Sequence, residues 1–171
     1  MRRPELDPHM RRISELASEI KRQVPDDSRI KGRVDFRADL AGLLTVCIVA
    51  NYEYCVKETL FKFASNHHCK FADYVSSHYG QLNSRIRINH LKEYCKDFDS
   101  DARNKFDNLF KTRKNIIKTN IGRDIEDSYN QIIEWRHAFA HTAQRKTTIE
   151  EAYKFHLLGR HVLFAFYDSF L

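Results

Sequence analysis

The sequence predicts an all-α protein, a compact bundle of about five to seven helices. Apolar residues recur at helical spacing along most of the 171 residues, and only 5 Gly and 3 Pro are available to interrupt them. No alternation of apolar and polar residues persists long enough to indicate a strand. Since this length suits one domain of ordinary size, we expect residues 1–171 to form a single helical domain.

The expected helices follow one another with short connections. Apolar periodicity predicts helices over residues 4–24, 35–66, 71–78, 86–98, 102–118, 124–140 and 149–171. Side-chain oxygens mark two helix starts, because Asp99 can cap the fifth helix and Thr148 forms a capping box with Glu151. Glycines mark two helix ends: Gly80 is expected in the left-handed conformation, and Gly122 closes the fifth helix.

The net charge favours a polyanionic partner. Lys and Arg number 29 against 23 Asp and Glu, which gives a net charge of +6 at pH 7. We expect RNA phosphates to be bound by the densest basic stretches, which comprise Lys111, Arg113, Lys114, Lys118, Arg145 and Lys146. A solvated helix face is the alternative explanation for these residues.

Residues that hold metals or cross-link chains lack the required spacing here. The four cysteines include no Cys-x-x-Cys pair, so we expect no disulfide framework. Residues 67–69, with Cys55, show no ordered ligand spacing, so neither a metal nor another cofactor is expected. The longest uncharged stretch, residues 40–51, is too short to span a bilayer. We therefore expect a cytoplasmic protein with no membrane partner.

The segment that carries chemistry is Glu-Trp-Arg-His-Ala-Phe-Ala-His, residues 134–141, at the expected end of the penultimate helix. Arg136 and His141 are five positions apart, so on an ideal helix they point about 140° away from each other. His137 and His141, four positions apart, share a face. The segment therefore gathers a fixed cation and two imidazoles within about one turn.

These groups are the ones that cleavage of RNA without a metal requires. One imidazole removes the proton of the attacking 2′-hydroxyl, and another protonates the leaving 5′-oxygen. A guanidinium stabilises the charge on the phosphoryl oxygens. A second copy of the segment, from a subunit related by two-fold symmetry, would supply the missing acid or base and a second arginine.

Residues 136–141 resemble the motif of HEPN ribonucleases, and most closely that of the RiboL-PSP-HEPN-like branch. Arg136, His137, Ala140 and His141 match the motif in place, and Thr148 matches the cap of the final helix. His137 stands where asparagine is commonest in the family, and the following residue is threonine where glycine often stands. Residues 49–54 are also similar to the family's long second helix, with its aromatic and acidic residues.

The resemblance implies a HEPN-like bundle that acts as a homodimeric, metal-independent endoribonuclease. It further implies a toxin or an antiviral defence effector, restrained by an antitoxin or another regulatory partner. Retention of Arg136 and His141 favours catalysis over the alternative, a silent HEPN domain that binds RNA, nucleotide or a protein. No short polar recognition helix follows a tight turn, which disfavours a helix-turn-helix DNA binder.

Individual residues of the motif have plainer explanations that the sequence leaves open. Arg136 could be a surface arginine, and His141 could simply end a helix and interact with its dipole. His137 could be solvated. Glu53 lies one turn from apolar residues and is a candidate to orient Arg136 or His141, but it could equally pair with Lys57, four residues later.

Overall fold

The structure is a computed structural model that describes residues 3–25, 32–80, 82 and 85–171. Within these ranges it contains seven α-helices and no strand, which confirms the all-α prediction. The helices are α1 (Asp7–Gln23), α2 (Arg33–His67), α3 (Cys69–Tyr79), α4 (Ile88–Phe98), α5 (Ser100–Ile121), α6 (Ile125–Thr142) and α7 (Ile149–Ser169).

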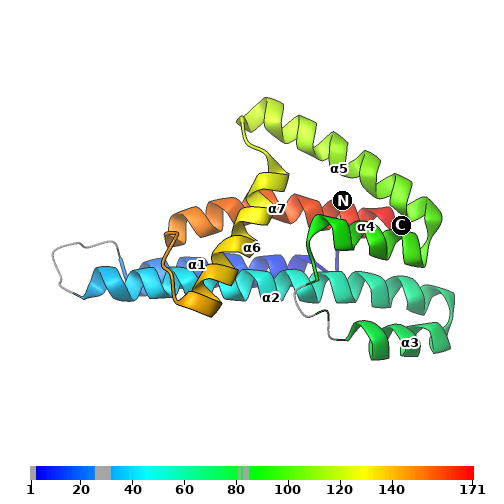
Figure 1. Ribbon diagram of the computed structural model, residues 1–171, viewed down its shortest axis with the longest axis horizontal. Coiled ribbons are helices and arrows are strands. Elements are labelled where there is room, and N and C mark those ends of the chain that lie inside the picture. Colours follow the sequence, from blue (N-terminus) through cyan, green and yellow to red (C-terminus); the bar gives the residue numbers. More distant parts are fainter. Residues whose placement is uncertain (1–2, 26–31, 81, 83–84) are drawn as a thin grey trace.

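Helix α2, with 35 residues, forms the long axis of the molecule (Figure 1). α1 and α7 run alongside it, and α3 folds back against its C-terminal half. α5 lies on the opposite side of α7, and α6 crosses from the end of α5 towards the N-terminal half of α2. The C-terminal end of α6 is thereby set against a long, continuous helix.

The core beneath α6 is built from aromatic side chains. Tyr52 and Tyr129 are both fully buried and stack with ring centroids 5.1 Å apart and planes 3° from parallel. The hydroxyl of Tyr52 lies 3.2 Å from Nδ1 of His156, which is also fully buried. Gly159 permits this packing, since a Cβ there would lie 3.1 Å from the Tyr129 backbone and 3.2 Å from the Tyr52 hydroxyl. These contacts join α2, α6 and α7.

Three of the four predicted helix-end signals are confirmed. Asp99 accepts a hydrogen bond from a backbone N–H of the first turn of α5, and Gly122 ends this helix with a φ of 70°. Thr148 accepts from the Glu151 backbone at 3.1 Å. The reciprocal half of that capping box differs, because the Glu151 carboxylate accepts from the Thr147 hydroxyl instead.

The fourth signal is correct in position and wrong in conformation. α3 ends at Tyr79 with Gly80 as its C-cap, but Gly80 has φ −59° and ψ −27°, which is the ordinary right-handed conformation and not the predicted left-handed one. Several helix bounds also differ from the predicted ranges by one to three residues. The difference that matters for function is in α6, which continues through Thr142 and not only to residue 140.

Candidate active site at the end of helix α6

The C-terminal half of α6 is positioned by a close contact with α2. Gly42 is buried in α2, and a Cβ at this position would lie 2.1–2.5 Å from ring atoms of Phe139. Glycine therefore leaves the space that Phe139 occupies. On another face of α6, Trp135 is nearly buried and packs on Phe155 of α7 with ring centroids 4.9 Å apart. The motif thus lies on a helix held from two sides.

Helix α6 ends in a left-handed residue directly after Thr142. Ala143 has a φ of 52°, and it is the one non-glycine residue with positive φ in the part of the chain that the structure describes. The backbone N–H of Ala143 donates to the Phe139 carbonyl at 3.0 Å, and that of Gln144 donates to Ala138 at 3.3 Å. The helix therefore keeps its regular geometry through His141.

The loop that follows α6 is tied to the start of α2. Arg145 donates to both carboxylate oxygens of Asp39, at 2.6 and 2.7 Å, and to Asp35 at 2.7 Å. Arg37 pairs with Glu150 at 2.5 Å at the start of α7. The bidentate pair of Arg145 with Asp39 fixes orientation as well as distance. The loop is therefore anchored at both of its ends.

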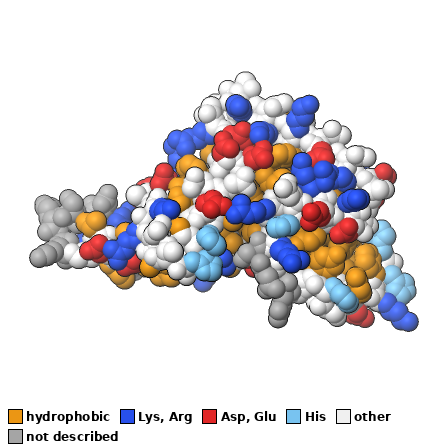
Figure 2. All heavy atoms as spheres, viewed as in Figure 1, with side chains coloured by type: hydrophobic (Ala, Val, Ile, Leu, Met, Phe, Trp, Pro, Cys, Tyr) orange, Lys and Arg blue, Asp and Glu red, His pale blue; other side chains and the backbone are white. Residues whose placement is uncertain are grey.

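The two imidazoles of the motif meet at the surface. The rings of His137 and His141 have centroids 4.4 Å apart, and both residues are exposed. Figure 2 shows histidine side chains on the surface over the lower end of α6, beside charged groups. His137 and His141 border a cavity of about 270 Å³. Its lining residues are Gln131, Glu134, Trp135, His137, Ala138, His141, Thr142, Gln144 and Lys146.

Arg136 does not share this cavity. Its side chain is half-buried and is not among the lining residues, as expected for a position about 140° from His141 on a regular helix. Within the described ranges, Arg136 makes no hydrogen bond, ion pair or cation–π contact. One chain therefore presents the imidazole pair on one side of α6 and an unpaired guanidinium on another.

Sequence reasoning did not single out several of the residues that line the cavity. Glu134 precedes His137 by three positions and His141 by seven, so helical periodicity alone places the three on one face. Its carboxylate accepts from Arg87 at 2.5 Å, and both side chains are about half exposed. Helical spacing could not predict that Arg87 pairs with Glu134, because Arg87 lies 47 residues earlier in the chain.

Glu53 follows Tyr52 on α2, and the Tyr52 ring stacks on Tyr129 in the first half of α6. Glu53 is half-buried, and its charge contributes to the raised pKa of Tyr129, of which burial is the main cause. Tyr129 precedes His141 by 12 positions, or about 18 Å along a helix. No contact joins Glu53 to Arg136, His141 or Lys57 within the described residues.

The predicted RNA-binding residues divide into engaged and free groups. Lys146 is exposed and lines the cavity with the imidazoles. Arg113 donates to Asp168 at 2.6 Å, and Lys114 pairs with Glu126 at 2.5 Å and Asp124 at 3.2 Å. Arg145 is held by α2, as described above. Lys111 and Lys118 are exposed on α5, outside the cavity.

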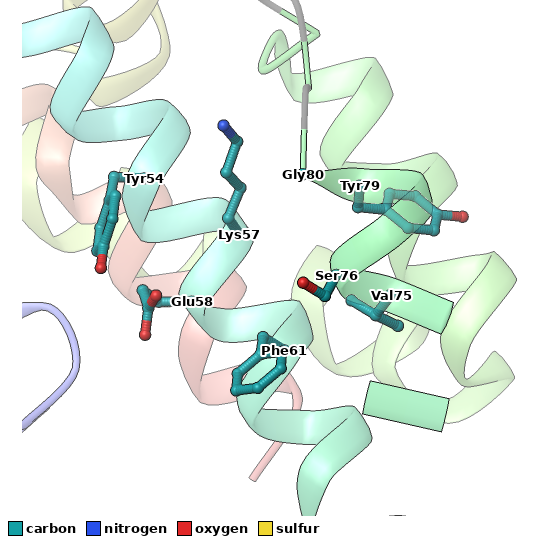
Figure 3. Close-up of a pocket in the computed structure, with 8 residues that line it drawn as sticks. All are labelled: Tyr54, Lys57, Glu58, Phe61, Val75, Ser76, Tyr79 and Gly80. Atoms are coloured by element: carbon teal, nitrogen blue, oxygen red, sulfur yellow. The ribbon is translucent and has the colours of Figure 1, made fainter. Parts of the chain in front are cut away.

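A second cavity of about 270 Å³ lies in the groove between α2 and α3 (Figure 3). It is lined by Tyr54, Lys57, Glu58 and Phe61 from α2 and by Val75, Ser76, Tyr79 and Gly80 from the end of α3 and the residue after it. A hydrogen bond to Glu58 raises the pKa of Tyr54. The groove contains none of the predicted site residues, and the imidazole next to it, that of His9, packs on the Tyr54 ring with centroids 4.3 Å apart.

Among the residues that the structure describes, no three His, Cys, Asp or Glu side chains are grouped so that they could hold a metal ion. None of the helices in the described ranges is long and apolar enough to cross a bilayer.

A comparison with known protein families finds one that spans nearly the whole chain. The model of the family described as RiboL-PSP-HEPN matches residues 10–170, a range that begins within α1 and continues past the end of α7. No curated protein and no solved structure matches the chain. The motif at the end of α6 lies inside the matched range.

Proposed function

Because the chain belongs to the RiboL-PSP-HEPN family, we propose that it is a metal-independent endoribonuclease whose active site is built on the end of α6. The observation that carries this proposal is the exposed pair of imidazoles, His137 and His141, with ring centroids 4.4 Å apart beside a cavity. Two imidazoles that solvent can reach are suited to giving and taking protons.

The proposed reaction is transesterification followed by release of the cleaved strand. One imidazole takes the proton of the 2′-hydroxyl, and the resulting oxygen attacks the adjacent phosphorus. The bond to the 5′-oxygen breaks, and a protonated imidazole returns a proton to that oxygen. The products are a 2′,3′-cyclic phosphate and a free 5′-hydroxyl. No oxidant, reductant or metal takes part.

Arg136 would stabilise the phosphoryl charge through its planar fork of donors. In one chain it lies on a different side of α6 from the imidazoles and has no carboxylate partner among the described residues. We therefore propose a homodimer in which the ends of two α6 helices meet. Such an arrangement lets the Arg136 of one chain serve a phosphate bound at the His141 of its partner.

The same proposal extends to biological role. An endoribonuclease of this kind fits a toxin or a defence effector against viruses, restrained by an antitoxin or another regulatory protein. The RNA substrate would be held near the site by Lys146, which lines the cavity. Lys111 and Lys118 would contribute phosphate contacts from α5.

The test is cleavage of mixed RNA by the purified chain in excess EDTA. We expect fragments that end in 2′,3′-cyclic phosphate, and we expect His141→Ala to abolish them. His78→Ala, an exposed histidine at the end of α3, is the matched control and should cleave normally. RNA that is bound but left intact by the unmodified chain would instead indicate a silent HEPN domain.

A further inference from the structure

A group of basic side chains on the other half of α7 includes a guanidinium, that of Arg160, with no acidic partner among the residues that the structure describes. This α5–α7 arginine cluster comprises Arg3, Arg113, Arg160, His161, Phe164 and Asp168. It shares no residue with the cavity beside His137 and His141. The proposed nuclease chemistry does not use it.

Asp168 is the carboxylate at the centre of this cluster. It accepts two hydrogen bonds from Arg3, at 2.9 and 2.7 Å, and one from Arg113 at 2.6 Å. Its side chain is 9% exposed. Both of its oxygens are therefore engaged by two guanidinium groups, and a third cation in the same place has to find its counter-charge elsewhere.

Arg160 is that third cation. Its guanidinium carbon lies 5.7 Å from the Phe164 ring centroid, and that of Arg3 lies 4.3 Å from the same centroid. Arg160 is half-buried and makes no ion pair with any residue that the structure describes. Two guanidinium groups thus lie beside one aromatic ring, and of these two Arg3 is paired with Asp168.

Three buried polar atoms of the cluster have no hydrogen-bond partner among the described residues. In the described part of the chain, Nε of Arg113, Nε of Arg160 and Nδ1 of His161 are buried without a hydrogen bond. His161 packs on Phe164 with ring centroids 5.5 Å apart. Burial is the main cause that lowers the pKa of His161 to about 4, and the charges of Arg160, Arg113 and Arg3 contribute to this shift. All three arginines therefore act on the same imidazole.

We propose that the α5–α7 arginine cluster binds a phosphate group, held by Arg160 and Arg113 beside His161. A guanidinium fork matches two oxygens of a phosphate, which would give Arg160 the acidic partner that it lacks among the described residues. The phosphate reaches the cluster from the solvent side, where Arg113, Arg160 and His161 are all half-buried and none is fully enclosed. The site would accept either a small phosphorylated molecule or a phosphate of an RNA strand.

The experiment measures binding to the purified full chain at constant ionic strength. The probes are inorganic phosphate, a 5′-mononucleotide and a 2′-O-methyl oligonucleotide, which cannot be cleaved by 2′-hydroxyl attack. Arg160→Gln removes the cation that has no acidic partner, and we expect it to weaken binding about tenfold. Arg12→Gln, an exposed arginine on α1, removes the same charge elsewhere and should leave binding within about twofold.

Each outcome decides the proposal. Loss of phosphate and mononucleotide binding in Arg160→Gln supports a small phosphorylated ligand, and loss for the oligonucleotide alone supports a nucleic-acid phosphate. Equal behaviour of the Arg160→Gln and Arg12→Gln chains in all three arms overturns the proposal. If Arg160→Gln does not fold, Arg160→Lys keeps the charge, loses the fork and should still weaken binding. Cleavage is not measured, so failure here leaves the nuclease proposal standing.

Discussion

The end of α6 and the core beneath it both contain histidine, and their surroundings are opposite. His137 and His141 are exposed, lie against each other and line a cavity. His156 is fully buried, contacts the Tyr52 hydroxyl, and has a pKa lowered by burial to about 3. A histidine held neutral inside a helical core cannot exchange protons with a substrate. Residue type therefore indicates function only together with accessibility.

The largest expected difference between these two regions is in catalysis. His141→Ala should lower the cleavage rate by about 10²–10⁴-fold, because a proton-transfer group is lost. Its Tm should stay close to that of the unmodified chain, since the side chain is exposed. The measurements are single-turnover cleavage of a labelled RNA and thermal unfolding followed by circular dichroism. A large drop in Tm would mean that His141 is structural.

His156→Ala should show the reverse pattern. It removes the contact with Tyr52 and leaves a cavity between α2 and α7, so the free energy of unfolding should fall by about 2–4 kcal/mol. Cleavage per folded molecule should change little. Urea unfolding, with activity normalised to the folded fraction, checks both statements. Normal stability together with lost activity would contradict the separation of the two regions.

Two glycines offer a matched pair of smaller changes. Gly42→Ala would press on the Phe139 ring, which precedes His141 by two positions, so it should displace the end of α6 and lower activity. Gly159→Ala would press on the Tyr129 backbone and should lower stability instead. Overpacking of this kind costs about 1–3 kcal/mol. The measurements are kcat/KM and the urea midpoint of unfolding for both variants. Equal losses of activity and of stability in the two variants would contradict the distinction between the end of α6 and the core.

Acid should destabilise the fold through the buried region. The pKa values of His156 and His161 are lowered from 6.5 to about 3 and about 4, mainly by burial. Below pH 6.5, the ordinary pKa of histidine, the unfolded chain binds protons at these two positions that the folded chain does not bind. The stability present above pH 6.5 should therefore fall as the pH drops towards these folded values. The measurement is Tm as a function of pH. His156→Gln should make the fall of Tm at low pH less steep, whereas His137→Gln, at an exposed position, should leave the part of that fall due to His156 and His161 unchanged.

The smallest predicted effect is at the turn after α6. Ala143 adopts a φ of 52°, which costs an L-residue about 1 kcal/mol relative to glycine. Ala143→Gly should therefore raise the free energy of unfolding by up to about 1 kcal/mol, visible as a shift in the urea midpoint. A decrease would mean that the lost side chain, or the freer unfolded chain, outweighs the relief of the turn.

Local features of this fold could be predicted from the sequence, and distant contacts could not. The seven helices and the caps at Asp99 and Thr148 depend on residues within a few positions of each other. The imidazole pair was predictable for the same reason. Gly80 was misjudged because its conformation does not follow from its residue type.

Features set by contacts between remote segments lay beyond such reasoning. The engagement of Arg145 depends on Asp35 and Asp39, more than 100 residues earlier in the chain. Glu134 could have been found by helical spacing, but its partner Arg87 could not. Glu53 follows Tyr52, which stacks on Tyr129 12 positions before His141, and this placement depends on how α2 crosses α6.

The most direct test of the shared active site is subunit mixing. Arg136→Ala chains and His141→Ala chains, each inactive alone, are combined and allowed to exchange, and the heterodimer is isolated with two different tags. A site that takes Arg136 from one chain and His141 from the other is then intact once in each heterodimer. We predict that the heterodimer regains cleavage of RNA in EDTA, up to half the activity of the unmodified dimer. A proven heterodimer with no activity above either parent would contradict a site shared in this way.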